Sequence, residues 1–145
     1  MTVTFFGHRD TPEKAEKNLL TVLIDLIENK KANRFLVGHN GSFDGMVKRL
    51  LTNLKKSYPH ISVLTVLAYL PEKDPYSLLN EKTETVYPEG LEAAPRRFAI
   101  CKRNEWMVKE SDIVITYVKG TSGGAARYKE FARRKQKQII EISES

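Results

Sequence analysis

The feature that most constrains the fold is a regular alternation between short apolar runs and longer amphipathic ones. The short runs are rich in β-branched residues, and the nearly continuous ones are typical of strands buried on both faces. They are TVTFF (2–6), RFLVG (34–38), ISVLTVLAY (61–69), DIVITYV (112–118) and QIIEI (138–142). Strands that alternate with helices predict right-handed crossovers, and therefore a parallel sheet with helices on both faces.

Two amphipathic stripes predict the helices that follow the first two strands. The apolar positions are Leu19, Leu20, Leu23, Leu26 and Ile27 in the first stripe, and Phe43, Met46, Val47, Leu50, Leu51 and Leu54 in the second. Thr11 is expected to cap the first helix, with Pro12 in its first turn. Two more helices are expected, from about 94 to 110 and from about 124. The pattern predicts an α/β, Rossmann-like three-layer sandwich with a mostly parallel sheet of about five strands.

Chain length and composition limit how much else is expected. The chain has 145 residues, of which 41% are apolar and 29% charged, which suits one domain over residues 1–145 with one core. Residues 70–95 contain four prolines and interrupt the alternation. Long connections of this kind are often lids or binding loops, so we expect either a lid or a passive surface excursion there.

Cysteine usage and hydropathy indicate the compartment. The lone Cys101 forms no internal disulfide and no structural zinc site, so we expect no metal and no required cofactor. Met1 leads directly into a strand, and no apolar run approaches the roughly 20 residues that span a bilayer. A cytoplasmic protein without a membrane partner is therefore expected, and homo-oligomerisation is left open.

The net charge of +6 favours anionic partners. Most of the excess lies in RYKEFARRKQK, residues 127–137, where six basic residues accompany one glutamate. Two interpretations stay open for this segment. It is either a solvated helix face or a patch that binds nucleic acid or phosphate.

Two loops are expected to form a ligand site. Ligands bind open parallel sheets outside the carboxyl ends of the strands, where the strand order reverses. If the first strand is central, GHRD after it faces KGTSGG after the strand at 112–118. A glycine-rich helix start holds phosphate through free backbone N–H groups, which leaves the first loop to present side chains. The candidate ligand-binding residues are Gly7, His8, Arg9, Gly120, Thr121, Ser122, Gly123 and Gly124.

A second glycine turn, GHNGSFDG at 38–45, follows the next strand and belongs to the same sheet edge. Its candidate ligand-binding residues are Gly38, His39, Asn40 and Ser42. No Walker lysine follows either glycine loop, so the chain is not a P-loop protein.

Arg103 lies in the middle of an apolar helical stripe, where an arginine usually has a paired anion. One interpretation is a structural ion pair with Asp112 or a glutamate. At 1.5 Å per residue Arg103 lies about 10 Å further along the helix than Arg96 and Arg97, which are expected to begin nearest the crevice.

These motifs together resemble the SLOG superfamily, the Rossmann-like group that contains the DprA-like proteins and the LONELY GUY phosphoribohydrolases. The resemblance rests on GHR after the first strand, the glycine turn after the second, RNEWMVKESDIVITYV followed by GTSGGA, and a final KQIIEI strand. The chain is most similar to the small YpsA-like branch. The resemblance implies a nucleotide site at the crevice, with Gly7, Arg9, Gly38, Arg103, Asn104 and residues 121–124 at or near the ligand.

Catalysis is left open by one departure from the family. LONELY GUY enzymes carry PGGxGTxxE with a catalytic glutamate, and GTSGGAARYKE has no glutamate at that spacing. Cleavage of an N-glycosidic bond needs a carboxyl group near the oxocarbenium-like centre. The candidates for that role are Asp10, Asp44, Glu89 and Glu92.

The leading hypothesis is a module that binds a small nucleotide or nucleotide-derived ligand, with phosphate on the loop after the strand at 112–118. A nucleoside monophosphate N-glycosidic hydrolase or transferase is the first alternative. Binding of single-stranded nucleic acid is the second.

Overall fold

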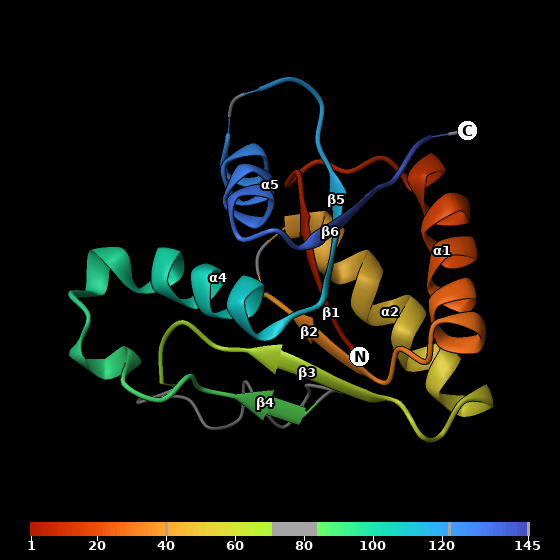
Figure 1. Ribbon diagram of the computed structural model, residues 1–145, viewed down its shortest axis with the longest axis horizontal. Helices are drawn as coiled ribbons and strands as arrows, with labels where there is room; N and C mark the ends of the chain where they lie inside the picture. Colours follow the sequence, from red (N-terminus) through yellow and green to blue (C-terminus); the bar gives the residue numbers. More distant parts are fainter. Residues whose placement is uncertain (40, 71–83, 122, 145) are drawn as a thin grey trace.

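The computed structural model describes residues 1–39, 41–70, 84–121 and 123–144. Its centre is a six-stranded sheet in the order β4-β3-β2-β1-β5-β6, in which every neighbouring pair is parallel (Figure 1). The strands are β1 Thr2–Gly7, β2 Arg34–Val37, β3 Ser62–Val66, β4 Glu84–Val86, β5 Ile113–Tyr117 and β6 Gln138–Glu141. The expected α/β class and parallel sheet are confirmed.

The sixth strand, β4, falls inside the segment that was expected to be a lid or excursion. It pairs with β3 at the edge of the sheet, where Leu64 lies opposite Glu84. The strand has only three residues, ETV, which is too few to show a period, and one of them is charged. The pattern of apolar residues therefore does not reveal it. Residues 71–83 of the same segment lie outside the described residues.

Helices cover both faces of the sheet (Figure 1). The α-helices are α1 Glu16–Asn29, α2 Gly41–Ser57, α4 Ala99–Glu110 and α5 Gly124–Arg134, and the short 3-10 turns are η1 Glu13–Ala15, η2 Leu91–Ala93 and η3 Arg96–Phe98. The first two helices share one core cluster with β1, β2 and β5, and the last two share another with the opposite face. The three-layer arrangement follows from these two clusters.

The apolar run of β1 is continuous because this strand lies inside the sheet and is covered by helices on both faces. Val3 and Phe5 point into the α1 and α2 layer, whereas Phe6 points into the α4 and α5 layer. A side chain of this size contributes about 1.5–3 kcal/mol when it is fully buried. Both layers of the fold therefore depend on the same short strand.

Two helix starts differ from the expectation. Thr11 does not cap the first helix, because its Oγ1 donates to the His8 carbonyl oxygen at 2.7 Å. The turn η1 comes next, and α1 itself begins at Glu16 without a side-chain cap. The helix expected from about 94 is also divided, since η3 precedes α4. The last helix begins at Gly124 as predicted.

The strand register decides which loops meet. Gly7, the last residue of β1, pairs with Tyr117, the last residue of β5. The two strands are neighbours although they are far apart in the chain, so the strand order reverses between them. The loops after β1 and β5 therefore lie side by side at the carboxyl edge, which is the place where such folds bind ligands.

Candidate functional site

The loop after β1 is tied to the first turn of α2. The backbone N–H of Ser42 donates to the Arg9 carbonyl oxygen at 2.9 Å, and its Oγ accepts the Thr11 N–H at 2.7 Å. Gly41 has φ +91°, and a Cβ on it would lie 3.0 Å from the Arg9 Cα. The glycine allows this close approach, and the predicted ligand residue Ser42 supports the loop backbone.

His8 joins the two loops at the sheet edge. Its Nε2 accepts the backbone N–H of Lys119 at 2.6 Å, which leaves Nδ1 as the ring nitrogen that faces other partners. The ring also meets Tyr117 edge to face, with centroids 5.8 Å apart. This contact holds the β1 and β5 loops in register beyond the last strand pair.

A cavity of about 450 Å³, here called the crevice, lies at this edge on the side of α4 and α5. It falls within the size range of small-molecule sites. Its lining residues come from the ends of β1 and β2, the first turn of α2, the inner face of α4 and the start of α5. They are Phe5, Phe6, Gly7, His8, Arg9, Gly38, Asp44, Ile100, Arg103, Asn104, Met107, Gly124, Ala125 and Tyr128.

Arg103 lies in the wall of the crevice with only 4% of its surface exposed. Its Nε donates to Asn104 Oδ1 at 3.0 Å, and its Nη1 donates to the Val66 carbonyl oxygen at 3.5 Å. Burial lowers the pKa of the guanidinium, and the nearby Asp44 carboxylate partly opposes that shift by raising it. The guanidinium is therefore a cation held in place by protein groups on α2, β3 and α4.

The predicted ion pair between Arg103 and Asp112 is wrong. The Asp112 Oδ2 accepts the Thr2 N–H at 2.9 Å near the start of β1, at the other end of the sheet. Arg103 instead lies beside Asp44 and Gly38. A Cβ on Gly38 would lie 2.9 Å from the Asp44 Oδ2 and 3.5 Å from the Arg103 Nη2, so a side chain there would crowd this pair.

The expectation that Arg96 and Arg97 begin nearest the crevice is also not met in the described structure. Both belong to η3, a separate turn before α4. The Arg96 guanidinium lies over the Tyr69 ring at 5.2 Å, and that of Arg97 lies over Phe98 at 4.8 Å. Neither lines the crevice, whereas Arg103 and Asn104, which were identified from the family resemblance, both do.

Tyr128 is a crevice residue that the sequence did not single out as a site residue. It is buried on the inner face of α5, and its ring stacks on Phe6 with centroids 5.2 Å apart. Burial raises the pKa of its hydroxyl to about 12, so it stays protonated. The helical spacing of Ala125, Tyr128 and Ala132 could have placed it on the inner face.

The predicted glycine loop after β5 is only partly at the crevice. Gly124, the first residue of α5, lines it, while Thr121 and Gly123 line another groove of about 630 Å³, which is bordered by α5 and by Glu105 of α4. Gly120 borders neither of these cavities as far as the described residues show. Asn40 and Ser122 lie outside the described residues. The Nδ1 of His39 lies 2.7 Å from Lys48 Nζ, on the exposed side of α2.

The four carboxylate candidates are dispersed. Asp44 is the one that lines the crevice among the described residues. Asp10 lines a second cavity, Glu92 lines a third beside Arg96, and Glu89 is exposed. Across the described residues no cluster of His, Cys, Asp and Glu has a metal-binding arrangement, and no helix is long and apolar enough to cross a membrane.

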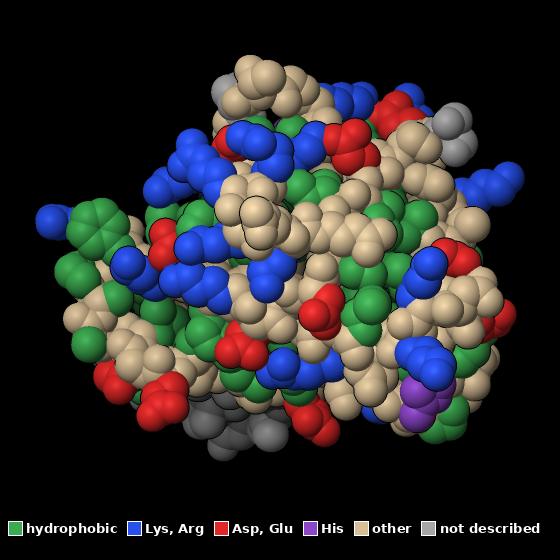
Figure 2. All heavy atoms as spheres, in the orientation of Figure 1, with side chains coloured by type: hydrophobic (Ala, Val, Ile, Leu, Met, Phe, Trp, Pro, Cys, Tyr) green, Lys and Arg blue, Asp and Glu red, His purple; other side chains and the backbone are tan. Residues whose placement is uncertain are grey.

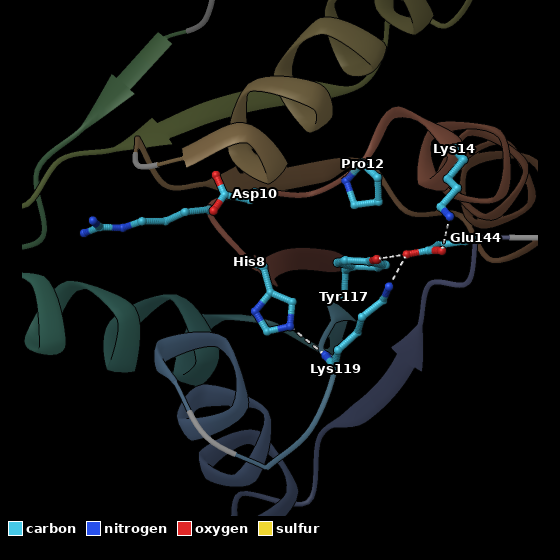
Figure 3. A pocket seen from close by; sticks show the side chains of 8 residues that line it. His8, Asp10, Pro12, Lys14, Tyr117, Lys119 and Glu144 are labelled. Carbon is cyan, nitrogen blue, oxygen red and sulfur yellow. Dashed lines mark hydrogen bonds and ion pairs between the residues drawn. The ribbon is translucent and has the colours of Figure 1, made fainter.

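The second cavity, of about 550 Å³, lies on the other side of His8 and Arg9, which line both cavities. Here Glu144 forms an ion pair with Lys14 at 2.9 Å and one with Lys119 at 2.5 Å, and the Tyr117 hydroxyl donates to the same carboxylate (Figure 3). The hydrogen bond from Lys119 is the largest cause of a fall in the pKa of Glu144 to about 2. Glu144 is therefore ionised throughout the physiological range.

Comparison with known proteins identifies the fold. No family model matches the chain, and no curated protein matches it. Among solved structures, DNA processing protein A (DprA) from Streptococcus pneumoniae matches with a TM-score of 0.69 at 14% identity, over 97% of this chain and 49% of that one. DprA from Helicobacter pylori, solved for its unique mode of binding single-stranded DNA, matches with a TM-score of 0.64 at 16% identity, over 97% of this chain and 64% of that one.

These neighbours agree with the resemblance at the level of the fold, since both are DprA proteins. The chain spans about half to two thirds of their length. Identities of 14% and 16% show a shared Rossmann-like fold and carry no site or activity across. The assignment to the YpsA-like branch stays a prediction.

Proposed function

We propose that the crevice binds a nucleotide or a nucleotide-derived ligand. The observation that carries this proposal is the convergence of the buried Arg103 guanidinium, the Arg9 side chain and the start of α5 on one cavity. Guanidinium groups bind phosphate with two parallel hydrogen bonds, and the first N–H groups of a helix attract anions. The two lining arginines outnumber the one lining carboxylate, Asp44, so the cavity has an excess of positive charge that favours a phosphate group.

The remaining walls suit the other parts of a nucleotide. Ile100 and Met107 present apolar side chains from α4, and Phe6 and Tyr128 form a stacked aromatic pair across the sheet edge. These groups offer an apolar surface to a base. The Asn104 amide and the His8 imidazole offer polar groups of the kind that fix the orientation of a ligand.

The proposal is tested by titrating a panel of nucleotides, comprising mono-, di- and cyclic forms, NAD and ADP-ribose, into the wild-type protein and two variants. Arg9→Gln removes a crevice cation, and we expect it to weaken binding by about tenfold or more, since hydrogen bonds to charged groups contribute about 1.5–3 kcal/mol. Proton NMR follows ligand broadening and, over several hours, release of free base.

Arg133→Gln is the matched control, because it removes the same charge from an exposed arginine of α5 that pairs with Glu130. The control should bind as the wild type does. Equal affinities for every ligand in the two variants would overturn the proposal. Release of free base that Asp44→Asn abolishes would instead establish the hydrolase alternative, in which Asp44 is the carboxylate that lines the crevice.

A second candidate function is single-stranded DNA binding, favoured by the Helicobacter pylori neighbour, whose DNA-binding mode is of this kind. Figure 2 shows Lys and Arg side chains gathered over α4 and α5. Some of these cations form ion pairs within the protein. Lys129 pairs with Glu141, and both Arg133 and Arg134 pair with Glu130. This function would use the outer face of α5 in addition to the crevice.

Fluorescence anisotropy with an oligo-dT tests this candidate across a series of salt concentrations. The double variant Arg127→Gln and Arg134→Gln is expected to bind more weakly. It should also reduce the slope of log K against log salt by about 0.7 for each phosphate that the variant no longer neutralises. The control is Lys17→Gln and Lys30→Gln, which removes two exposed charges at α1, on the opposite face. Binding that is independent of salt, or affected equally by both double variants, excludes a DNA site on this face.

A further inference from the structure

The Glu144 carboxylate is bound by three side chains that come from separate parts of the chain. Lys14 belongs to η1, Tyr117 ends β5, and Lys119 lies in the loop after it (Figure 3). Both lysine ammonium groups and the tyrosine hydroxyl point at the same carboxylate. Two cations and a neutral donor around one oxyanion is the arrangement by which proteins bind a phosphate or a carboxylate.

Two backbone hydrogen bonds position the chain just before Glu144. Ile142 is buried and its N–H donates to the Thr116 carbonyl oxygen at 2.8 Å, so the chain is anchored up to that residue. After it, the Ser143 N–H donates to Asn18 Oδ1 at 2.8 Å. The Lys14 and Lys119 side chains are each 65% exposed, and the Glu144 side chain is 23% exposed. Glu144 lies beyond the buried Ile142 and belongs to neither core cluster, so its side chain can leave these partners without disturbing the core.

The charge balance of the second cavity becomes more positive when Glu144 leaves it. The lining cations are Arg9, Lys14 and Lys119, and the lining anions are Asp10 and Glu144. Three positive charges against two negative ones give a balance of +1, and withdrawal of Glu144 raises it to +2. A cavity with this excess attracts a doubly charged anion more strongly than a singly charged one.

We propose that Lys14, Tyr117 and Lys119 form a phosphate-binding subsite, and that Glu144 occupies it in place of a ligand phosphate. The subsite goes beyond the proposed function of the crevice, because its donors do not line that cavity. The two cavities share His8 and Arg9. A ligand with two separated phosphate groups would displace Glu144 from the subsite while its other part lies in the crevice.

The subsite is tested with inorganic phosphate, which does not require any nucleotide to bind. Glu144→Gln keeps the size of the side chain and removes the competing charge. We expect the phosphate concentration at half saturation to fall roughly tenfold relative to the wild type, equivalent to about 1.4 kcal/mol. The readout is the ¹H–¹⁵N spectrum, in which the backbone amides of Lys119 and Ser143 should shift with phosphate.

Two further variants make the result specific. Glu141→Gln removes a carboxylate of β6 that pairs with Lys129 of α5, and should leave phosphate binding as in the wild type. Adding Lys119→Gln to Glu144→Gln should reverse the gain. Equal gains in the Glu144 and Glu141 variants, or a gain that survives the Lys119 substitution, would overturn the subsite.

Acetate and phosphate are compared in the Glu144→Gln protein. Phosphate should bind more tightly because it carries more charge, and acetate that binds as tightly overturns the assignment to phosphate. Retained phosphate binding together with a crevice that takes no nucleotide would reject only the proposed function. Thermal unfolding of each variant confirms that the fold is intact before titration.

Discussion

Replacing Arg103 by methionine is expected to weaken nucleotide binding in the crevice by about 100-fold or more. The guanidinium is buried and held by Asn104 and the Val66 carbonyl, so a ligand phosphate would meet it with little loss of side-chain entropy. Methionine retains much of the length of the side chain and has no charge. Isothermal titration with the tightest ligand of the nucleotide panel measures the effect.

The same substitution is expected to reduce stability, and the two effects have to be separated. Loss of the guanidinium leaves the Asp44 carboxylate without the nearby cation that opposes its charge, which costs about 2 kcal/mol if it behaves like other charged hydrogen-bonding groups. Urea unfolding measures this cost. Adding Asp44→Asn should restore most of the stability and none of the binding.

Recovery of binding in the double variant would contradict a direct role for Arg103. It would mean that the arginine acts by neutralising Asp44 and that the phosphate is held elsewhere. Full stability of the single variant would contradict the structural part of the prediction, namely that Asp44 depends on this cation.

The strands and the order of the helices could be predicted from the sequence because each buried strand carries its own signal. The run at 112–118 is apolar almost throughout, as β5 requires between two helical layers. The edge strand β4 has no such signal, since it has a neighbouring strand on one side only and its three residues follow no period. Local patterns thus identify central elements better than edges.

The site was predicted in part, and the errors have one cause. The helical stripe showed that Arg103 faces inward, and the partner expected for it was Asp112, which is near in sequence, or a glutamate. Its actual charge partner, Asp44, comes from the first turn of α2, which lies beside Arg103 only because β1 and β2 pair and end at the same edge of the sheet. The contacts of Glu144 similarly depend on the chain crossing from β6 to α1, which no local pattern encodes.

Gly7→Ala is expected to destabilise the protein by about 1–3 kcal/mol, as is typical of overpacked cores. A Cβ on Gly7 would lie 2.2 Å from the Phe43 Cγ and 2.7 Å from its Cβ, so rotation of the ring cannot relieve the clash. Phe43 is buried and stacks against Tyr117, with centroids 6.4 Å apart. The first turn of α2 must therefore shift, and Asp44 shifts with it.

Gly45→Ala is the matched control for this prediction. Gly45 lies in the same helix α2, and a Cβ on it meets no atom within 4 Å, so the substitution should stabilise the helix by about 0.5–1 kcal/mol. Urea unfolding of both variants gives opposite signs if the contact between Gly7 and Phe43 is as close as described. A Gly7→Ala protein as stable as the Gly45→Ala protein would show that α2 moves freely over the sheet edge, and the crevice wall that depends on Asp44 would then not be rigid.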